Sequence, residues 1–146
     1  MSSIYKIVTF LLLSFLIAYI SIKIQSSFID TISSNIIGLL TTLFAINIAS
    51  STLVAGKLSE ISNKTGHNFP NTKSNLRISF YEQIILIALT FVVGIIRESC
   101  LLKTHMDVYT LKLICDSLLI FAFIYYLDIL KDIGKALFNL LDANYK

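Results

Sequence analysis

The chain has 146 residues, of which 55% are apolar and only 14% are charged. Soluble domains carry about 25% charged residues, so the composition indicates a membrane protein, and the length suits one helical bundle without a separate soluble domain. The net charge of +3 comes from basic residues spread along the chain, whereas nucleic-acid-binding proteins gather Lys and Arg on one face. We therefore expect no nucleic-acid partner.

The first apolar segment covers residues 4–24, with Lys6 near its start and Lys23 near its end. A cleaved signal peptide also begins with a basic residue and an apolar core. Here the core is longer than usual, and Ala18-Tyr19-Ile20 offers no small-x-small cleavage site. We expect a retained membrane helix with Lys23 reaching the interface. The short connection before residue 31 predicts that the first and second helices are antiparallel neighbours.

The second segment, residues 31–56, contains 26 residues and no charge, and about 20 residues are enough to cross a bilayer. Small and polar residues recur along it at steps of three and four, which places them on one helix face. This face, called the polar stripe below, consists of Thr31, Ser34, Asn35, Gly38, Thr41, Thr42, Ala45, Ala49, Thr52 and Gly56. Ile36, Leu40, Leu43 and Val54 lie on the opposite face, where lipid or a large apolar neighbour suits them.

The polar stripe has two interpretations. Small residues let helix backbones approach closely, so the stripe is typical of helix packing in membranes. A wetted surface lining a pore or cavity in an oligomer has the same composition. Under both interpretations we expect the stripe to face protein or water and not acyl chains. Asn47 lies among the large residues of the opposite face, so we expect its amide to form a structural hydrogen bond with another helix; an ion ligand is the alternative.

Charged residues continue the helical pattern after Gly56 as far as Thr65-Gly66, where glycine can end a helix. We expect a loop over residues 57–77, with its irregular part around Pro70, the single proline. The third and fourth spans are expected at residues 78–97 and 109–127.

Residues 128–146 repeat leucine and isoleucine at helical spacing against balanced charges. This pattern predicts an amphipathic tail that lies on the membrane or packs against the extended end of the second helix. The predicted fold is thus an all-α membrane protein, a four-transmembrane-helix bundle with a C-terminal amphipathic helix, forming a single domain over residues 1–146.

Ionisable residues within a membrane are expensive to bury and are therefore candidates for function. Those within or at the ends of the last two spans are Glu82, Arg97, Lys112 and Asp116. Their structural interpretation is that each lies close enough to a helix end to reach headgroups or water. Lys112 and Asp116 are four residues apart and can neutralise each other. Glu82 is expected to pair with Arg77 or to face the bundle.

No catalytic motif is present: the sequence has no Gly-rich phosphate loop, no G-x-S-x-G and no H-E-x-x-H. The two cysteines form no disulfide framework, and Cys100, His105 and Cys115 match no metal-ligand spacing. We expect a protein that is not an enzyme and that holds neither a metal nor a cofactor.

The basic residues predict an orientation in the membrane. With the N-terminus inside, the cytoplasmic segments hold eight basic residues and the outer segments hold four. Cytoplasmic loops carry the excess of Lys and Arg, so both termini and residues 57–77 are expected in the cytoplasm.

The order of segments also carries a resemblance to a known family. A short first span precedes a second that begins Thr31-Ile32-Ser33-Ser34, becomes rich in Ala and Thr, and runs into the charged residues 57–64. With two further spans and a polar tail, the chain resembles the small four-span bacterial membrane proteins of abortive-infection and anti-phage systems, the kind represented by the phage lambda Rex membrane component.

The resemblance implies an effector in the bacterial inner membrane that breaches this membrane on a signal from a partner protein. We expect a homo-oligomer in the bilayer, with the partner binding residues 57–77 and 128–146 in the cytoplasm. The alternative is a non-toxic membrane scaffold, a bacteriocin-immunity protein or an accessory subunit of a membrane complex.

Overall fold

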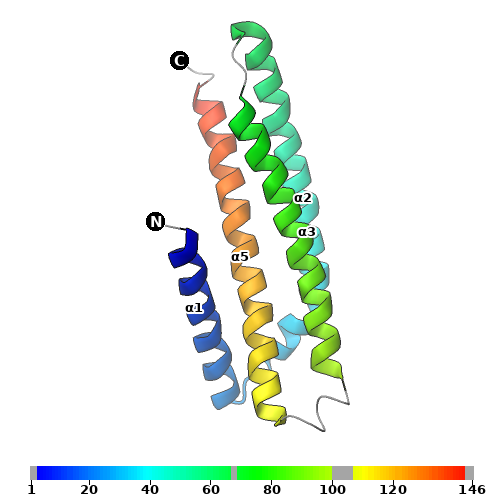
Figure 1. Cartoon of the computed structure of the whole chain (residues 1–146). Helices are drawn as coiled ribbons and strands as arrows, with labels where there is room; N and C mark the ends of the chain where they lie inside the picture. Colours follow the sequence, from blue (N-terminus) through cyan, green and yellow to red (C-terminus); the bar gives the residue numbers. More distant parts are fainter. Residues whose placement is uncertain (1–2, 67–68, 100–106, 144–146) are drawn as a thin grey trace.

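The computed structural model describes residues 3–66, 69–99 and 107–143, apart from the side chains of residues 3, 65 and 140–143. Its helices are α1 (Ser3–Lys23), α2 (Phe28–Thr65), α3 (Pro70–Glu98) and α5 (Val108–Ala143). Each runs antiparallel to the helix before it (Figure 1). All four are long and apolar enough to cross a membrane. The described part of the chain is therefore an all-helical bundle of a multi-pass membrane protein.

The central helix is α5, which packs along α1, α2 and α3. In Figure 1 it runs between α1 on one side and α2 and α3 on the other. The first two helices are antiparallel, as expected, but they are not close neighbours, because α1 and α2 make few contacts. Ser14 and Ala18 of α1 are fully buried, and Ala18 packs with Ile120 of α5 and Ile29 in the first turn of α2. The short connection joins helix ends but does not decide which helices pack.

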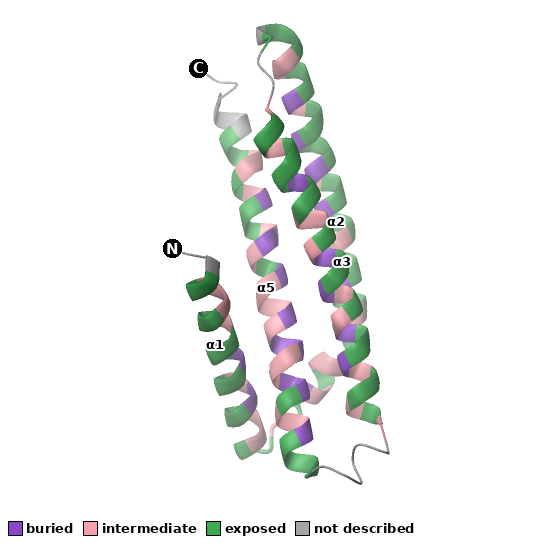
Figure 2. Cartoon of the chain, viewed as in Figure 1, coloured by how far each residue is buried: buried purple, intermediate pink, exposed green. Residues whose placement is uncertain are grey.

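The main hydrophobic core lies between α2, α3 and α5. The buried apolar residues of α2 are Ile36, Leu40, Val54 and Leu58. Figure 2 shows buried residues on the sides of the helices that face α5, whereas the outer side of α1 is exposed. The large residues of α2 were expected to face either lipid or a large apolar neighbour. The structure shows that they pack against apolar residues of α3 and α5.

Three of the helices are longer than a bilayer requires. At 1.5 Å per residue, the 21 residues of α1 span about 32 Å, close to the hydrocarbon thickness of about 30 Å. The 38, 29 and 36 residues of α2, α3 and α5 span about 57, 44 and 54 Å. Their excess length lies at the end of the bundle where α2 is joined to α3 (Figure 1). We call residues 57–65, 70–77 and 128–143 the three-helix extension.

The extension differs from the sequence-based expectation in two places: the segment around Pro70 and the C-terminal tail. Within the expected loop 57–77, α2 continues to Thr65, as the helical pattern after Gly56 predicted, but α3 already begins at Pro70, where an irregular segment was expected. As expected, α2 ends at a glycine: Gly66 has the left-handed φ of 70°, and its N–H donates to the Ser62 carbonyl at 2.9 Å. Pro70 occupies the first turn of α3, where its missing N–H is tolerated.

The expected C-terminal tail is likewise no separate helix. Residues 128–143 continue α5 without a break, and Ile129 and Ile133 are buried in the main core. The third and fourth expected spans therefore lie within α3 and α5 but are shorter than either helix. Cys115 is buried, as expected of a small apolar side chain. His67, Cys100 and His105 lie outside the described residues.

An ion pair fixes the N-terminal end of α1 to the middle of α5. Lys6 pairs with Asp128, and its Nζ lies 3.6 Å from Asp132 Oδ2. The Asp128 side chain is only 10% exposed. Because Asp128 stands where the extension begins, this pair marks the end of the part of the bundle that α1 covers.

Candidate functional site

The polar stripe of α2 is exposed on the surface of the single chain. All ten of its residues are exposed, and a Cβ added to Gly38 or Gly56 meets nothing within 4 Å. Leu39, Ile46 and Leu53 flank the stripe and are also exposed. Within one chain the stripe packs against no other helix, because the opposite face of α2 is the one that packs. That the stripe faces protein or water and not acyl chains stays a prediction.

The polar atoms of the stripe are bonded to its own backbone. Thr41, Thr42 and Thr52 each donate to the carbonyl oxygen four residues earlier at 2.8 Å. Thr31, Ser34 and Asn35 bond to backbone carbonyls in the same way. These side chains therefore have their donors satisfied within α2.

A buried polar cluster lies on the opposite face of α2. Asn47 Nδ2 donates to Gln83 Oε1 of α3 at 2.6 Å, which confirms the expected interhelical hydrogen bond. Tyr126 of α5 donates to the same oxygen at 3.2 Å, and Ser51 Oγ lies 3.5 Å from Asn47 Oδ1. All four residues are buried. The cluster thus connects the three long helices through one shared acceptor.

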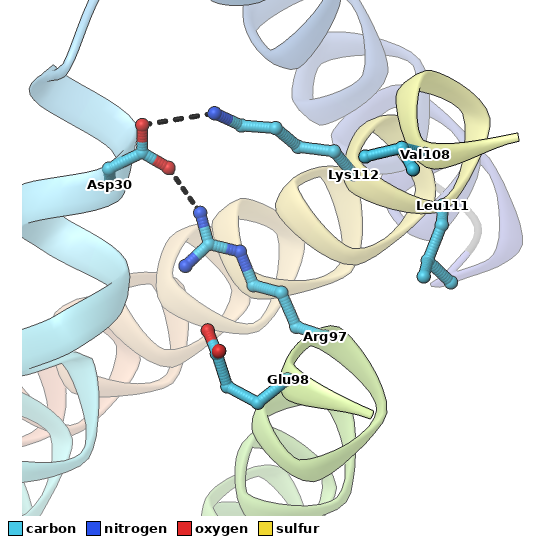
Figure 3. Close-up of a pocket in the computed structure, with 6 residues that line it drawn as sticks. All are labelled: Asp30, Arg97, Glu98, Val108, Leu111 and Lys112. Carbon is cyan, nitrogen blue, oxygen red and sulfur yellow. Dashed lines mark hydrogen bonds and ion pairs between the residues drawn. The ribbon is translucent and has the colours of Figure 1, made fainter. Parts of the chain in front are cut away.

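A cluster of charges lies at the end of the bundle opposite the extension. Figure 3 shows Asp30 of α2 facing Arg97 of α3 and Lys112 of α5, with an interaction to each. Lys112 Nζ lies 3.0 Å from Asp30 Oδ2. The expected pairing of Lys112 with Asp116 is thus replaced by one between helices, because the long Lys112 side chain reaches the carboxylate of α2.

The fourth member of the cluster, Asp116, is almost completely buried. Its side chain is 1% exposed, and Arg97 Nε lies 3.2 Å from its Oδ1. Neither carboxylate oxygen, however, accepts a well-directed hydrogen bond from any described residue. Asp116 therefore interacts with Arg97 mainly through charge, and Arg97 is shared between the partly exposed carboxylate of Asp30 and this buried one.

The charge cluster borders a pocket of about 280 Å³. Its lining residues are Asp30, Arg97, Glu98, Val108, Leu111 and Lys112 (Figure 3). Within the described part of the chain, no three His, Cys, Asp or Glu side chains are grouped so as to hold a metal ion. The pocket has the opposite charges of an ion-pair network, and its basic groups are already matched by carboxylates.

Glu82 is half-buried on α3, next to Gln83 of the buried polar cluster. Among the described residues it forms no ion pair with Arg77, which is exposed on α3. Of the two expectations for Glu82, facing the bundle agrees better with its partial burial.

Sequence reasoning missed Asp30, Gln83 and Tyr126. Asp30 immediately precedes the uncharged second segment, and antiparallel spans place residues 30, 97 and 112 at the same end of the bundle. The order of the antiparallel spans therefore suffices to predict that Asp30 lies near Arg97 and Lys112. Gln83 and Tyr126 had a weaker signal, because a buried amide in lipid needs a polar partner on another helix, but the identity of that partner depends on helix rotation.

Fold and polar clusters together define a four-helix multi-pass membrane protein with an exposed polar stripe. No family model matches the chain, and no curated protein or solved structure is significantly similar to it.

Proposed function

We propose that this protein is a bacterial inner-membrane effector that self-associates through the polar stripe of α2 and permeabilises the membrane. The observation that supports the proposal is that all ten residues of the stripe are exposed on a single chain. Helices in membranes associate where small residues allow close approach, and a second copy of the chain presents the matching surface. Several copies would bring their stripes together around a central pore.

The proposal gives the three-helix extension the role of receiving a signal. Its residues lie in the cytoplasm in the proposed orientation, and a partner protein binds there and changes how the α2 helices assemble. A role in abortive infection against phage is supported by the architectural resemblance described above. The action on the membrane requires no enzyme chemistry and no cofactor.

The test is to add bulk to the stripe without touching the core. Ala45→Leu with Ala49→Leu should abolish oligomers in detergent, measured by cross-linking, and abolish dye release from vesicles. Ala88→Leu is the control, because Ala88 is exposed on α3 and receives the same added bulk. Unchanged oligomers and unchanged dye release in the double variant would contradict the proposal. A second test induces the unaltered protein in cells, together with its neighbouring genes and during phage infection. An unchanged membrane potential in these cells would also contradict the proposal.

A second candidate is a non-toxic membrane scaffold, a bacteriocin-immunity protein or an accessory subunit whose stripe packs on a different protein. The bonding of the stripe hydroxyls to their own backbone favours it, because these groups offer few free donors to water. Under this alternative, the Ala45→Leu and Ala49→Leu changes abolish a complex with the other protein, and the unaltered chain releases no dye from vesicles.

A further inference from the structure

A groove of about 470 Å³ lies between α2 and α3 at the base of the three-helix extension. Its apolar walls come from Ala55, Leu76 and Phe80, and two hydroxyls come from Ser51 and Thr52. The remaining lining residues are Lys73 and Arg77 of α3. Apolar walls with basic residues and hydroxyls suit an amphiphile with a negative head.

Both basic residues of the groove lack an acidic partner among the described residues. Lys73 and Arg77 are exposed and four residues apart on α3. By contrast, Lys57 and Lys64 of the adjoining end of α2 are held by Glu60 at 2.8 and 2.9 Å. These two bonds also lower the pKa of the Glu60 carboxyl to about 2. Glu60 is therefore occupied by lysines of its own helix, and Lys73 and Arg77 remain available to an anion.

The height of the groove matches a membrane boundary. Arg77 and Arg97 are 20 residues apart on α3, which is about 30 Å along a helix and about the thickness of the hydrocarbon layer. If Arg97 and its partners in the charge cluster lie at one surface, Arg77 lies among the headgroups of the other. The apolar walls of the groove then meet the ends of the acyl chains.

We propose that this groove binds an anionic phospholipid. Its phosphate accepts hydrogen bonds from the Arg77 guanidinium and the Lys73 ammonium, which are the usual donors to phosphate. An acyl chain lies against Ala55 and Phe80 and continues into the bilayer. Basic pockets between membrane helices bind anionic headgroups in this way. The proposal is independent of the proposed function, although Thr52 belongs to both the groove and the polar stripe.

The test uses a single fluorescent reporter in the groove. The chain has no tryptophan, so Phe80→Trp introduces one at the groove wall, in the full chain reconstituted into phosphatidylcholine vesicles. Brominated phosphatidylglycerol should quench this tryptophan more strongly than brominated phosphatidylcholine at equal mole fraction. The expected preference for phosphatidylglycerol is roughly fivefold for each basic residue.

A matched pair of charge-removing variants separates a site from general surface attraction. Lys73→Gln with Arg77→Gln should bring the preference close to one. Lys131→Gln with Lys135→Gln should leave it unchanged, because these exposed lysines have the same spacing on α5 but do not line the groove. Equal loss in both double variants, or no preference in the parent chain, would overturn the proposal.

Two further measurements complete the test. Inorganic phosphate at millimolar concentration should not relieve the quenching, and relief by phosphate alone would show a free-anion site and overturn the assignment to lipid. If the reporter variant does not fold, the thermal midpoint of the unsubstituted chain in detergent replaces it. Phosphatidylglycerol should raise that midpoint more than phosphatidylcholine does, and equal responses would overturn the proposal.

Discussion

Arg97 is the residue on which the charge cluster depends most. It pairs with Asp30, which is partly exposed and also has Lys112, and with Asp116, which is buried. Losing Arg97 would leave Asp30 with one cation and Asp116 with none within ion-pairing distance among the described residues. The loss of the Arg97 guanidinium should therefore cost more stability at Asp116 than at Asp30.

Arg97→Gln is expected to destabilise the protein by roughly 3–5 kcal/mol, because it leaves a buried charge without its partner. Lys112→Gln should change stability by no more than about 1 kcal/mol, since both Lys112 and Asp30 are partly exposed. Unfolding by heat in detergent micelles measures both effects. Adding Asp116→Asn to Arg97→Gln should recover most of the loss. Similar losses in the Arg97 and Lys112 variants would show that Asp116 does not depend on Arg97.

The buried polar cluster allows a second measurement at the residue scale. A double-mutant cycle of Asn47→Ala and Gln83→Ala should give a coupling free energy of roughly 0.6–1.7 kcal/mol, the range for hydrogen bonds between membrane helices. Tyr126→Phe should lose less than Asn47→Ala, because the Tyr126 bond is longer, at 3.2 against 2.6 Å. Additive effects of Asn47→Ala and Gln83→Ala would mean that their bond contributes nothing to stability.

At the scale of elements, the sequence predicts the four spans and the continuation of α2 to Gly66, but it predicts neither the early start of α3 nor the unbroken length of α5. The end of α2 follows from a local signal, Gly66, and is found where expected. The start of α3 at Pro70 was missed because the polar residues 71–75 suggest a loop. The first turns of α3 are stabilised by tertiary contacts that the periodicity of the sequence does not reveal. Leu76, for example, is buried in the same core as Leu58 and Ile133. The extension therefore depends on tertiary packing of three segments.

Two glycines should respond in opposite ways to substitution by alanine. Gly66→Ala should destabilise the α2–α3 connection by roughly 1–2 kcal/mol, because the left-handed conformation is strained for a residue with a Cβ. Gly134→Ala should stabilise α5 by up to about 1 kcal/mol, since alanine favours helix and the added methyl meets nothing within 4 Å. Thermal midpoints compared with the unaltered chain give both signs. A stabilising Gly66→Ala would contradict the strain argument.

At the scale of the whole molecule, the choice of central helix is not visible in the sequence. All four helices are apolar enough to span a membrane, so hydropathy alone does not tell which of them is surrounded by the others. The polar partners that define the arrangement are far apart in the chain, such as Lys6 with Asp128 and Asn47 with Gln83. The number and approximate positions of the spans are thus predictable from the sequence, whereas the packing partners require three-dimensional structure.

The proposed orientation gives a prediction for the two ends of the bundle. In a chain with Cys100→Ser and Cys115→Ser, Ser59→Cys should react with an impermeant maleimide only from the cytoplasmic side, because Ser59 is exposed on the extension. Tyr109→Cys, exposed at the other end, should react only from the outer side. Leu12→Cys, exposed in the middle of α1, should react from neither. Labelling of Ser59→Cys from outside would reverse the orientation.

The central position of α5 has a consequence for biogenesis, since this helix leaves the ribosome after α1, α2 and α3. Until it arrives, α1 lacks the neighbour that covers Ser14 and Ala18 and neutralises Lys6. We expect α1, α2 and α3 to remain unassembled in the translocon or in the surrounding lipid until α5 is inserted. The bundle then assembles around α5 in one late step. We therefore expect nascent chains that stop before residue 108 to be substrates for membrane quality-control proteases.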